Sequence, residues 1–193
     1  MLDQNALDTL FNNARSHNGW LDSDVSNEQI NQIYELMKYG PTAANNSPAR
    51  ITFVKSAAGK QKLKAHLDEG NVEKAMAAPV IAIISYDIEF YEKLPFLFPH
   101  ADARSWYAGN DAKIKSAGEM NATLQGAYFM MAARSVGLDC GPMGGFNSDT
   151  LDKEFFADGK IKSIFLCAIG QGDSSKIFPR SPRLSFDEAC NIL

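Results

Sequence analysis

The chain has 193 residues, of which 45% are hydrophobic and 22% are charged, the balance of a globular protein with a sizeable core. The 19 basic and 23 acidic residues leave a net charge of −4, which argues against a broad basic surface for nucleic acid or anionic lipid. This composition excludes a disordered chain, a collagen and a coiled-coil rod, and the length suits one domain at residues 1–193.

The N-terminus and the cysteines predict a soluble protein of the cytoplasm. The first residues are acidic and polar, so no secretory signal is expected. No apolar run approaches the ~20 residues of a membrane-spanning helix. Cys140, Cys167 and Cys190 are odd in number and far apart, which favours reduced, mostly buried thiols over disulfides or a zinc site. We therefore expect no membrane and no nucleic acid among the partners.

The first half of the chain predicts four helices and two strands. Ser26 and Gln29 have the spacing of a capping box and begin a helix at 27–39, with one apolar face and a stop at Gly40. The run at 79–86 is continuously apolar and predicts a buried strand. The other elements expected here are helices at 6–14, 57–67 and 71–77, a strand at 50–55 and a polar loop at 42–48.

The second half predicts one long helix at 113–135 and a second buried strand at 161–169. An aromatic loop at 94–110 precedes the helix and has the length of a functional loop or lid. The remaining expected elements are a glycine-rich turn at 141–146, a helix at 148–156 capped by Ser148, a loop at 170–183 and a terminal helix at 184–192. Helices with scattered strands indicate an α+β fold with a mixed sheet flanked by helices.

The long helix is apolar on almost every face between residues 120 and 133. Met120, Leu124 and Tyr128 lie on one side, and Phe129 and Met130 lie on others. A helix that is apolar all round is buried all round, and a chain of this length has little room to bury it alone. We therefore expect this helix to lie at a homodimer interface.

Common catalytic motifs are absent, and polar residues gather instead in four separate loops. Gly170 and Gly172 offer only half of a dinucleotide fingerprint, and His17, His66 and His100 share no metal-ligand spacing. The four clusters lie at 15–18, 41–48, 71–74 and 141–146, the last together with 180–183. Each alone is compatible with a helix cap, a tight turn or surface charge.

Together, the clusters resemble the FMN-dependent nitroreductase family. Residues 15–20 resemble its N-terminal R-x-S-x-R-x-F region, and residues 39–50 resemble its W-x-P-S-x-x-N-x-Q-P-W-R signature. Residues 141–145 resemble its flavin-side turn, and Arg183 its terminal arginine. The resemblance covers essentially the whole chain. It implies one FMN-binding domain with the nitroreductase-like fold, a homodimer, and NADPH or NADH as electron donor.

Within the family, several unusual stretches resemble the short, RutE-like malonic semialdehyde reductases of pyrimidine degradation. These stretches lie at 18–20, 90–95, 98–100, 102–106, 172–176 and 182–186. The resemblance implies reduction of malonic semialdehyde to 3-hydroxypropanoate, with ping-pong hydride transfer through flavin N5. Arg104, in the aromatic loop, is the candidate clamp for the substrate carboxylate, with a structural salt bridge as the alternative. No other side chain is expected to be catalytic.

The resemblance also implies which residues contact the cofactor. An arginine fork suits phosphate, and an asparagine amide suits the flavin's mixed donor and acceptor edge. Lysine stabilises negative charge on the reduced ring, and glycine lets main chain approach it closely. The candidate cofactor residues are Arg15, Ser16, His17, Asn18, Pro41, Thr42, Ala43, Asn45, Asn71, Lys74, Pro142, Met143, Gly144, Gly145, Arg180 and Arg183. Asn45 is expected to act across the dimer, and no metal is expected.

Two residues depart from the family pattern. Asn18 stands where the N-terminal motif has its second basic residue, and Gly144 stands where some branches have a glutamate. Two other functions remain open: a broad-specificity nitroaromatic or quinone reductase, and a non-catalytic flavin-binding dimer. A structural dimer without any cofactor is the remaining alternative.

Overall fold

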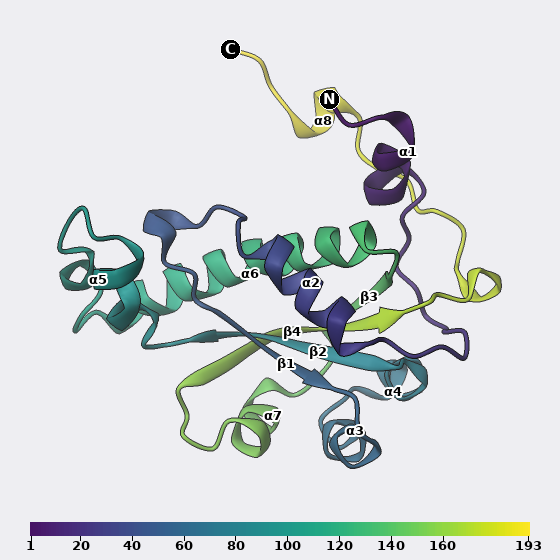
Figure 1. Ribbon diagram of the computed structural model, residues 1–193, viewed down its shortest axis with the longest axis horizontal. Coiled ribbons are helices and arrows are strands. Elements are labelled where there is room, and N and C mark those ends of the chain that lie inside the picture. Colours follow the sequence, from purple (N-terminus) through teal and green to yellow (C-terminus); the bar gives the residue numbers. More distant parts are fainter.

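The computed structural model describes residues 1–193 as one sheet with helices on both faces (Figure 1). The strands β1 (Ala49–Val54), β2 (Val80–Asp87), β3 (Asp139–Met143) and β4 (Ile161–Gly170) lie in the order β1-β2-β4-β3. All neighbouring pairs are antiparallel. The α+β class is confirmed, but the expected mixed sheet is wrong. β3 runs parallel to β2, yet β4 lies between them, so no two neighbouring strands are parallel.

Eight helices surround this sheet. They are α1 (Gln4–Leu7), α2 (Asn27–Met37), α3 (Ala57–Lys64), α4 (Glu69–Ala77), α5 (Leu94–Leu97), α6 (Asp111–Ser135), α7 (Ser148–Phe155) and α8 (Phe186–Ala189). A π-helical turn at Asp8–Asn12 continues α1, and short 3-10 turns occupy Ala43–Asn45, Phe90–Lys93, Ala103–Trp106 and Ser174–Lys176. In Figure 1, α2 and α6 lie on one face of the sheet, and α3, α4 and α7 lie on the other.

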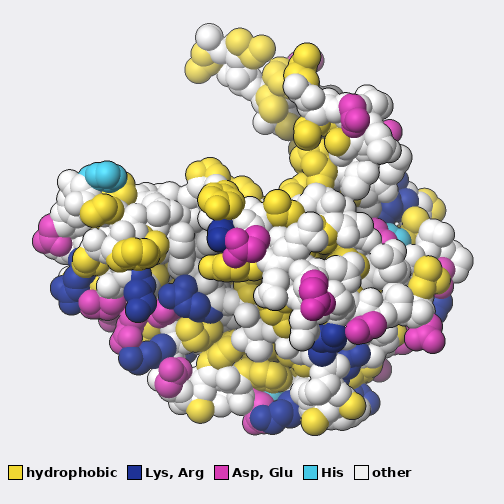
Figure 2. All heavy atoms as spheres, viewed as in Figure 1, with side chains coloured by type: hydrophobic (Ala, Val, Ile, Leu, Met, Phe, Trp, Pro, Cys, Tyr) yellow, Lys and Arg dark blue, Asp and Glu magenta, His cyan; other side chains and the backbone are white.

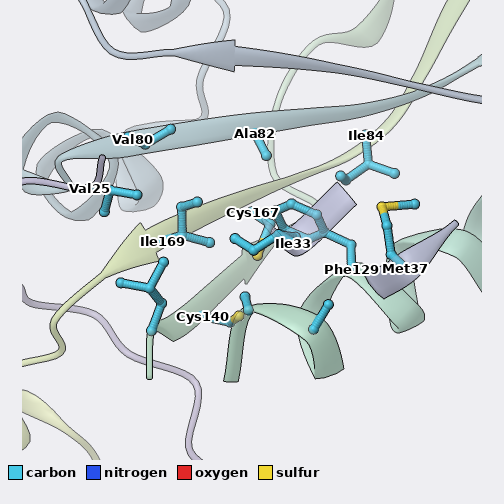
Figure 3. Close-up of a cluster of buried hydrophobic side chains, with 13 residues drawn as sticks. Val25, Ile33, Met37, Val80, Ala82, Ile84, Phe129, Cys140, Cys167 and Ile169 are labelled. Atoms are coloured by element: carbon cyan, nitrogen blue, oxygen red, sulfur yellow. The ribbon is translucent and has the colours of Figure 1, made fainter. Parts of the chain in front are cut away.

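The strand β2 is buried on both faces, as its continuous apolar run predicts. Its alternate residues divide between two hydrophobic clusters because neighbouring side chains on a strand point to opposite faces. Val80, Ala82 and Ile84 belong to the cluster with α2 and α6, whereas Ile81 and Ile83 belong to the cluster with α3, α4 and α7. Figure 3 shows the first cluster, in which the buried thiols of Cys140 and Cys167 lie among aliphatic side chains; Cys190 is exposed.

The helix α2 begins with the predicted capping box. Ser26 Oγ accepts from the Gln29 N–H over 3.1 Å, and Gln29 Oε1 accepts from the Ser26 N–H over 3.0 Å. Ile33 and Met37 are buried on its apolar face, whereas Tyr34 is exposed. The capping box is therefore confirmed, and its two hydrogen bonds explain why α2 starts at the predicted residue.

The helix α6 is not buried on all faces within one chain. Ala122, Gly126 and Phe129 are buried on the sheet side, whereas Met120 and Leu124 are 56% and 42% exposed. These exposed side chains line an open groove of about 750 Å³ along α6. None of the helices combines the length and apolarity needed to cross a membrane.

The expected glycine-rich turn at 141–146 is half wrong, because Asp139–Met143 form the edge strand β3. Glycine and proline disfavour strands, but an edge strand tolerates a proline that offers no N–H. Gly141 fits there for another reason: a Cβ would lie 2.5 Å from the carbonyl oxygen of His17. The cap of α7 is also corrected, since Asn147 Oδ1 accepts from the Thr150 N–H and Ser148 is the first helical residue.

The aromatic segment after β2 and the two termini form separate outlying parts. Phe90, Leu94, Ala103, Tyr107 and Ile114 form a small third cluster, so the expected loop at 94–110 is a packed set of short helices. The N- and C-terminal segments project together from the body, with α1 near α8 (Figure 1). Hydrophobic side chains gather on this projection in Figure 2. The terminal helix α8 is shorter than predicted.

Candidate functional site

The segment at residues 15–20 lies along the free edge of the sheet, beside β3. The His17 N–H donates to the carbonyl oxygen of Cys140 over 2.9 Å. The Trp20 indole N–H donates to the carbonyl oxygen of Lys74 over 3.0 Å, which ties the segment to the end of α4. Because the edge of a sheet offers unpaired main-chain groups, this segment obtains a fixed backbone there.

The His17 side chain is buried and does not line the cleft that its neighbours form. His17 is only 6% exposed, and its Nε2 lies 3.4 Å from Asp139 Oδ1. A Cβ on Gly172 would overlap the imidazole ring, so only glycine leaves it room. The buried imidazole therefore anchors the segment, and the contact of His17 with the cofactor stays a prediction.

A cleft of about 440 Å³ lies beside this segment and collects arginines from three parts of the chain. Four of the six arginines in the sequence line it: Arg15, Arg134, Arg180 and Arg183. The other lining residues are Phe11, Ala14, Ser16, Asn18, Phe178, Pro179 and Ser181. The fold thus brings the predicted N-terminal motif and C-terminal loop into one site, which we call the arginine cleft. Arg134 is a member that sequence analysis missed.

None of the four arginines in the arginine cleft forms a salt bridge, whereas the two arginines elsewhere each pair with a carboxylate. Within the cleft, the guanidinium groups bond only to neutral acceptors. Arg180 Nη2 donates to the carbonyl oxygens of Asn12 and Ala14 over 2.6 and 3.0 Å, and Arg15 donates to that of Phe178. The cleft therefore holds uncompensated positive charge in an acidic protein, the arrangement that suits a phosphate group.

A second group of predicted residues meets where α4 approaches the turn after β3. Asn71 Nδ2 donates to the carbonyl oxygen of Gly145 over 2.8 Å, and the Asp68 N–H donates to the same oxygen over 3.1 Å. Asn71 Oδ1 accepts no hydrogen bond within the chain. A Cβ at Gly144 would meet nothing within 4 Å, so this glycine borders open space. The amide and the turn therefore present free polar groups at an accessible surface.

The neighbours of this turn contribute in different ways. Lys74 is half-buried in the last turn of α4 without a salt bridge, and burial lowers the pKa of its ammonium group. Pro142 and Met143 belong to β3, and the Met143 side chain lies in the core below the turn. The contacts of Pro142 and Met143 with the cofactor stay a prediction, and for Met143 they would involve its main chain.

The loop at residues 41–48 lies apart from the arginine cleft within one chain (Figure 1). Asn121 Oδ1 accepts from the Ala43 N–H over 2.8 Å, whereas Arg134 marks the cleft at the far end of α6. These two helix positions are about 20 Å apart along the axis. The Tyr128 hydroxyl donates to the carbonyl oxygen of Pro41 over 2.9 Å, and Thr42 Oγ1 accepts from the Ser47 N–H. One chain therefore does not unite all the predicted cofactor residues.

The backbone of this loop is strained. Ala44, Asn45 and Ser47 have φ values of 50°, 50° and 37°, in the left-handed region. Residues other than glycine hold such angles only where surrounding contacts impose them, and these positions concentrate at functional sites. The Asn45 side chain donates to the carbonyl oxygen of Leu97 over 2.9 Å and joins the loop to α5.

Arg104 has a partner in its own chain. Its Nε and Nη2 both donate to the Glu92 carboxylate over 2.7 Å, a bidentate pair on the exposed surface. This pair lowers the pKa of Glu92 through the hydrogen bond and raises that of Arg104. The structural salt bridge is therefore formed, and a substrate carboxylate has to displace Glu92 to use the same fork. No group of three or more His, Cys, Asp or Glu side chains is arranged to hold a metal ion.

Adjacent glycines in the turn give a matched test of this geometry. Gly145→Ala is expected to destabilise the protein by about 1–3 kcal/mol, because the new Cβ would overlap Asn71 Nδ2 and lie 2.8 Å from Asp68 Oδ2. Gly144→Ala is expected to leave the thermal midpoint of the flavin-free protein unchanged. Differential scanning calorimetry of both variants measures this; equal midpoints for the two would contradict the described turn.

The fold resembles that of solved structures of one class. A candidate nitroreductase from Bacillus subtilis has a TM-score of 0.90 at 20% identity, covering 99% of this chain and 100% of that one. A candidate nitroreductase from Exiguobacterium sibiricum, solved in complex with FMN, has a TM-score of 0.86 at 18% identity, covering 100% and 99%. At these identities, the likeness establishes the nitroreductase fold.

Sequence comparison establishes the family. The model of the nitroreductase family matches residues 13–172. A protein from Ralstonia nicotianae, named as a candidate NADH dehydrogenase/NAD(P)H nitroreductase, is 55% identical over 192 residues, covering 100% of this chain and 98% of that protein. A relative of the same description from Polynucleobacter asymbioticus is 54% identical over 193 residues, with 100% and 98% covered. The chain belongs to the nitroreductase family.

Proposed function

We propose that the protein is an FMN-dependent NAD(P)H oxidoreductase. The observation that carries the proposal is the arginine cleft, where four guanidinium groups without a carboxylate partner face one space. A phosphate monoester is the part of FMN that such a donor set fits. The names of the relatives, an NAD(P)H nitroreductase and a nitroreductase with bound FMN, support the same cofactor and donor.

The residues present fit FMN in three places. Arg15, Arg180 and Arg183 would hold its phosphate, with Ser16 and Asn18 beside them. Asn71 Oδ1 is a free acceptor for the N–H of a flavin ring, and the open space at Gly144 admits a flat ring against main chain. When bound, FMN supplies a two-electron carrier whose N5 takes electrons from NAD(P)H and passes them to an acceptor in alternate half-reactions.

The protein's own groups hold and polarise the reactants. Lys74 carries its positive charge in a half-buried position without a counter-ion, so it would stabilise negative charge that develops nearby. Main-chain N–H groups of the turn at 144–145 offer hydrogen bonds without any side-chain proton transfer. No nucleophilic side chain is needed, which agrees with a site built from amides, main chain and cations.

We also propose that the working unit is a homodimer. The exposed face of α6 carries Met120 and Leu124. It is apolar, as is the side of the same helix that faces the core. Pairing this face with its copy would bury it. Within one chain, the loop at 41–48 lies apart from the arginine cleft. In a homodimer, the loop of the second copy, with the strained Asn45, would lie beside the cleft of the first. The small-molecule site would then be shared between subunits.

Malonic semialdehyde is the proposed acceptor, on the strength of the distinctive stretches at 90–95, 98–100 and 102–106. Glu92 on Arg104 shows that this guanidinium can hold a carboxylate by two parallel hydrogen bonds. In the proposed complex, the substrate carboxylate takes the place of Glu92. A nitroaromatic or quinone acceptor is the second candidate, favoured by the nitroreductase names of the relatives.

The variant Arg104→Gln separates these acceptors. We expect the KM for malonic semialdehyde to rise about tenfold or more, because a charge-assisted contact is lost, while the KM for an uncharged quinone stays unchanged. Glu92→Gln is the matched control and is expected to lower the KM for the aldehyde by releasing Arg104. Steady-state kinetics with both acceptors give the result, and equal changes for both would assign Arg104 a structural role only.

The non-catalytic alternative is tested by the donor reaction. The flavin-loaded protein is mixed anaerobically with NADPH and then, in a separate sample, with NADH. The proposal predicts loss of the oxidised flavin absorbance with at least one donor, and the faster donor identifies the preference. A flavin that both donors leave oxidised would make the protein a flavin-binding dimer.

A further inference from the structure

Arg134 enters the arginine cleft from an element that carries no other predicted site residue. It lies in the last turn of α6, whereas Arg15 precedes β1 and Arg180 and Arg183 follow β4. Its Nη1 donates to the carbonyl oxygen of Leu10 over 2.9 Å. The same Nη1 also donates to Met131 Sδ over 3.9 Å, and the Nη2 atom has no partner in the chain.

The Nε atom of Arg134 is the unusual feature. It is buried and has no hydrogen-bond partner in the chain. Leaving a buried donor of a charged group unsatisfied is costly, so such a group is an exception that calls for a partner. No carboxylate pairs with Arg134, although Arg50 and Arg104 outside the cleft each have one. An anion in the cleft that Arg134 lines would compensate the charge of this guanidinium group.

Asn18 lines the same cleft. Asn18 is neutral, so the N-terminal segment at 15–20 supplies only the charge of Arg15 to the cleft. The fold supplies one positive charge to the same space from α6 instead. We propose that Arg134 is a phosphate-binding residue of the arginine cleft and adds from α6 a positive charge that Asn18 does not supply. This inference rests on the proposed binding of FMN.

A purely structural role for Arg134 makes a different prediction. A cation in the last turn interacts favourably with the helix dipole, and the hydrogen bond to Leu10 ties the N-terminal segment to α6. Either effect stabilises the protein regardless of the ligand. Phosphate binding, in contrast, affects FMN and leaves riboflavin untouched, because riboflavin has the same ring without the phosphate.

The experiment measures the affinity of the flavin-free protein for FMN and riboflavin by flavin fluorescence quenching. The variants are Arg134→Gln, Arg134→Lys, Asn18→Lys and the double variant Arg134→Gln/Asn18→Lys. Lys153→Gln, which removes one exposed positive charge from α7 far from the cleft residues in sequence, is the control. Thermal midpoints of all flavin-free proteins are recorded in parallel.

We expect Arg134→Gln to bind FMN about 10- to 100-fold more weakly and riboflavin with unchanged affinity. Arg134→Lys is expected to retain part of the FMN affinity, and adding Asn18→Lys to Arg134→Gln is expected to restore most of it. Lys153→Gln should match the wild type. If Arg134→Gln is unstable, Asn18→Lys alone still tests the idea, since it should strengthen FMN binding and not riboflavin binding.

Three results would overturn the inference. One is unchanged FMN affinity in Arg134→Gln, and another is an equal loss for FMN and riboflavin. The third is a double variant that Asn18→Lys does not improve. If the wild-type protein binds FMN and Arg134→Gln binds it with equal affinity, this inference alone is rejected. A wild-type protein that binds no FMN rejects the proposed function together with it.

Discussion

Leu124→Asp is expected to convert the proposed homodimer into a monomer. Leu124 lies beside Met120 on the exposed apolar face of α6 and lines the groove along it. In a two-fold interface the substitution occurs twice, and each carboxylate loses water without gaining a counter-ion. An uncompensated buried charge costs about 3–5 kcal/mol, so the pair would remove most of the association energy.

Sedimentation velocity of the wild type and the variant measures this effect. Leu21→Asp is the matched control, because Leu21 is also an exposed leucine, 54% accessible, but lies outside α6. The control should remain dimeric. A Leu124→Asp protein that stays dimeric would place the interface elsewhere. If the monomer also loses FMN, as expected for a site shared between subunits, the loop at 41–48 of the second copy completes the site.

Gly172→Ala is expected to destabilise the protein and to weaken FMN binding. The new Cβ would overlap the imidazole ring of His17, which is buried against Asp139. Overpacking of this kind costs about 1–3 kcal/mol. Because His17 anchors the segment that carries Arg15, FMN affinity should fall as well.

Urea denaturation measures the free energy of unfolding, and fluorescence quenching measures FMN affinity. Gly70→Ala is the control, because a Cβ there meets nothing within 4 Å and the residue lies inside α4, where alanine is favoured over glycine. It should be neutral or slightly stabilising. A Gly172→Ala protein as stable as the wild type would show that His17 is not held by this contact.

The elements that sequence analysis predicted correctly are those whose signals are local. Ser26 and Gln29 form both bonds of a capping box within four residues, and the start of α2 follows from them. The two strands at the centre of the sheet each contain a short continuous apolar run, which predicts a buried strand.

The elements it missed depend on distant partners. β3 contains Gly141 and Pro142, which disfavour a strand, and only pairing with β4 and the approach of His17 make it one. The antiparallel order likewise depends on where β4 inserts between β2 and β3. No local pattern contains that information, so tertiary contacts decide it.

The candidate site shows the same division. The family resemblance named Arg15, Arg180 and Arg183, and the fold brings them together. It gave no indication of Arg134, which reads in the sequence as the polar end of an apolar helix. The one available signal was the absent basic residue at Asn18, which implies a replacement but not its location. Nothing in the sequence indicated that the His17 ring is buried, because its packing depends on Asp139 and Gly172, which are distant in the chain.

FMN bound in the arginine cleft of a homodimer is the central feature of the proposed function. The most direct test is to incubate the purified protein with excess FMN, remove the free flavin by gel filtration, and record the visible spectrum of the dimer peak. We expect a retained flavin spectrum with about one FMN per chain, and the Arg15→Gln/Arg183→Gln protein should lose it. A colourless dimer that retains no FMN would contradict the proposed function.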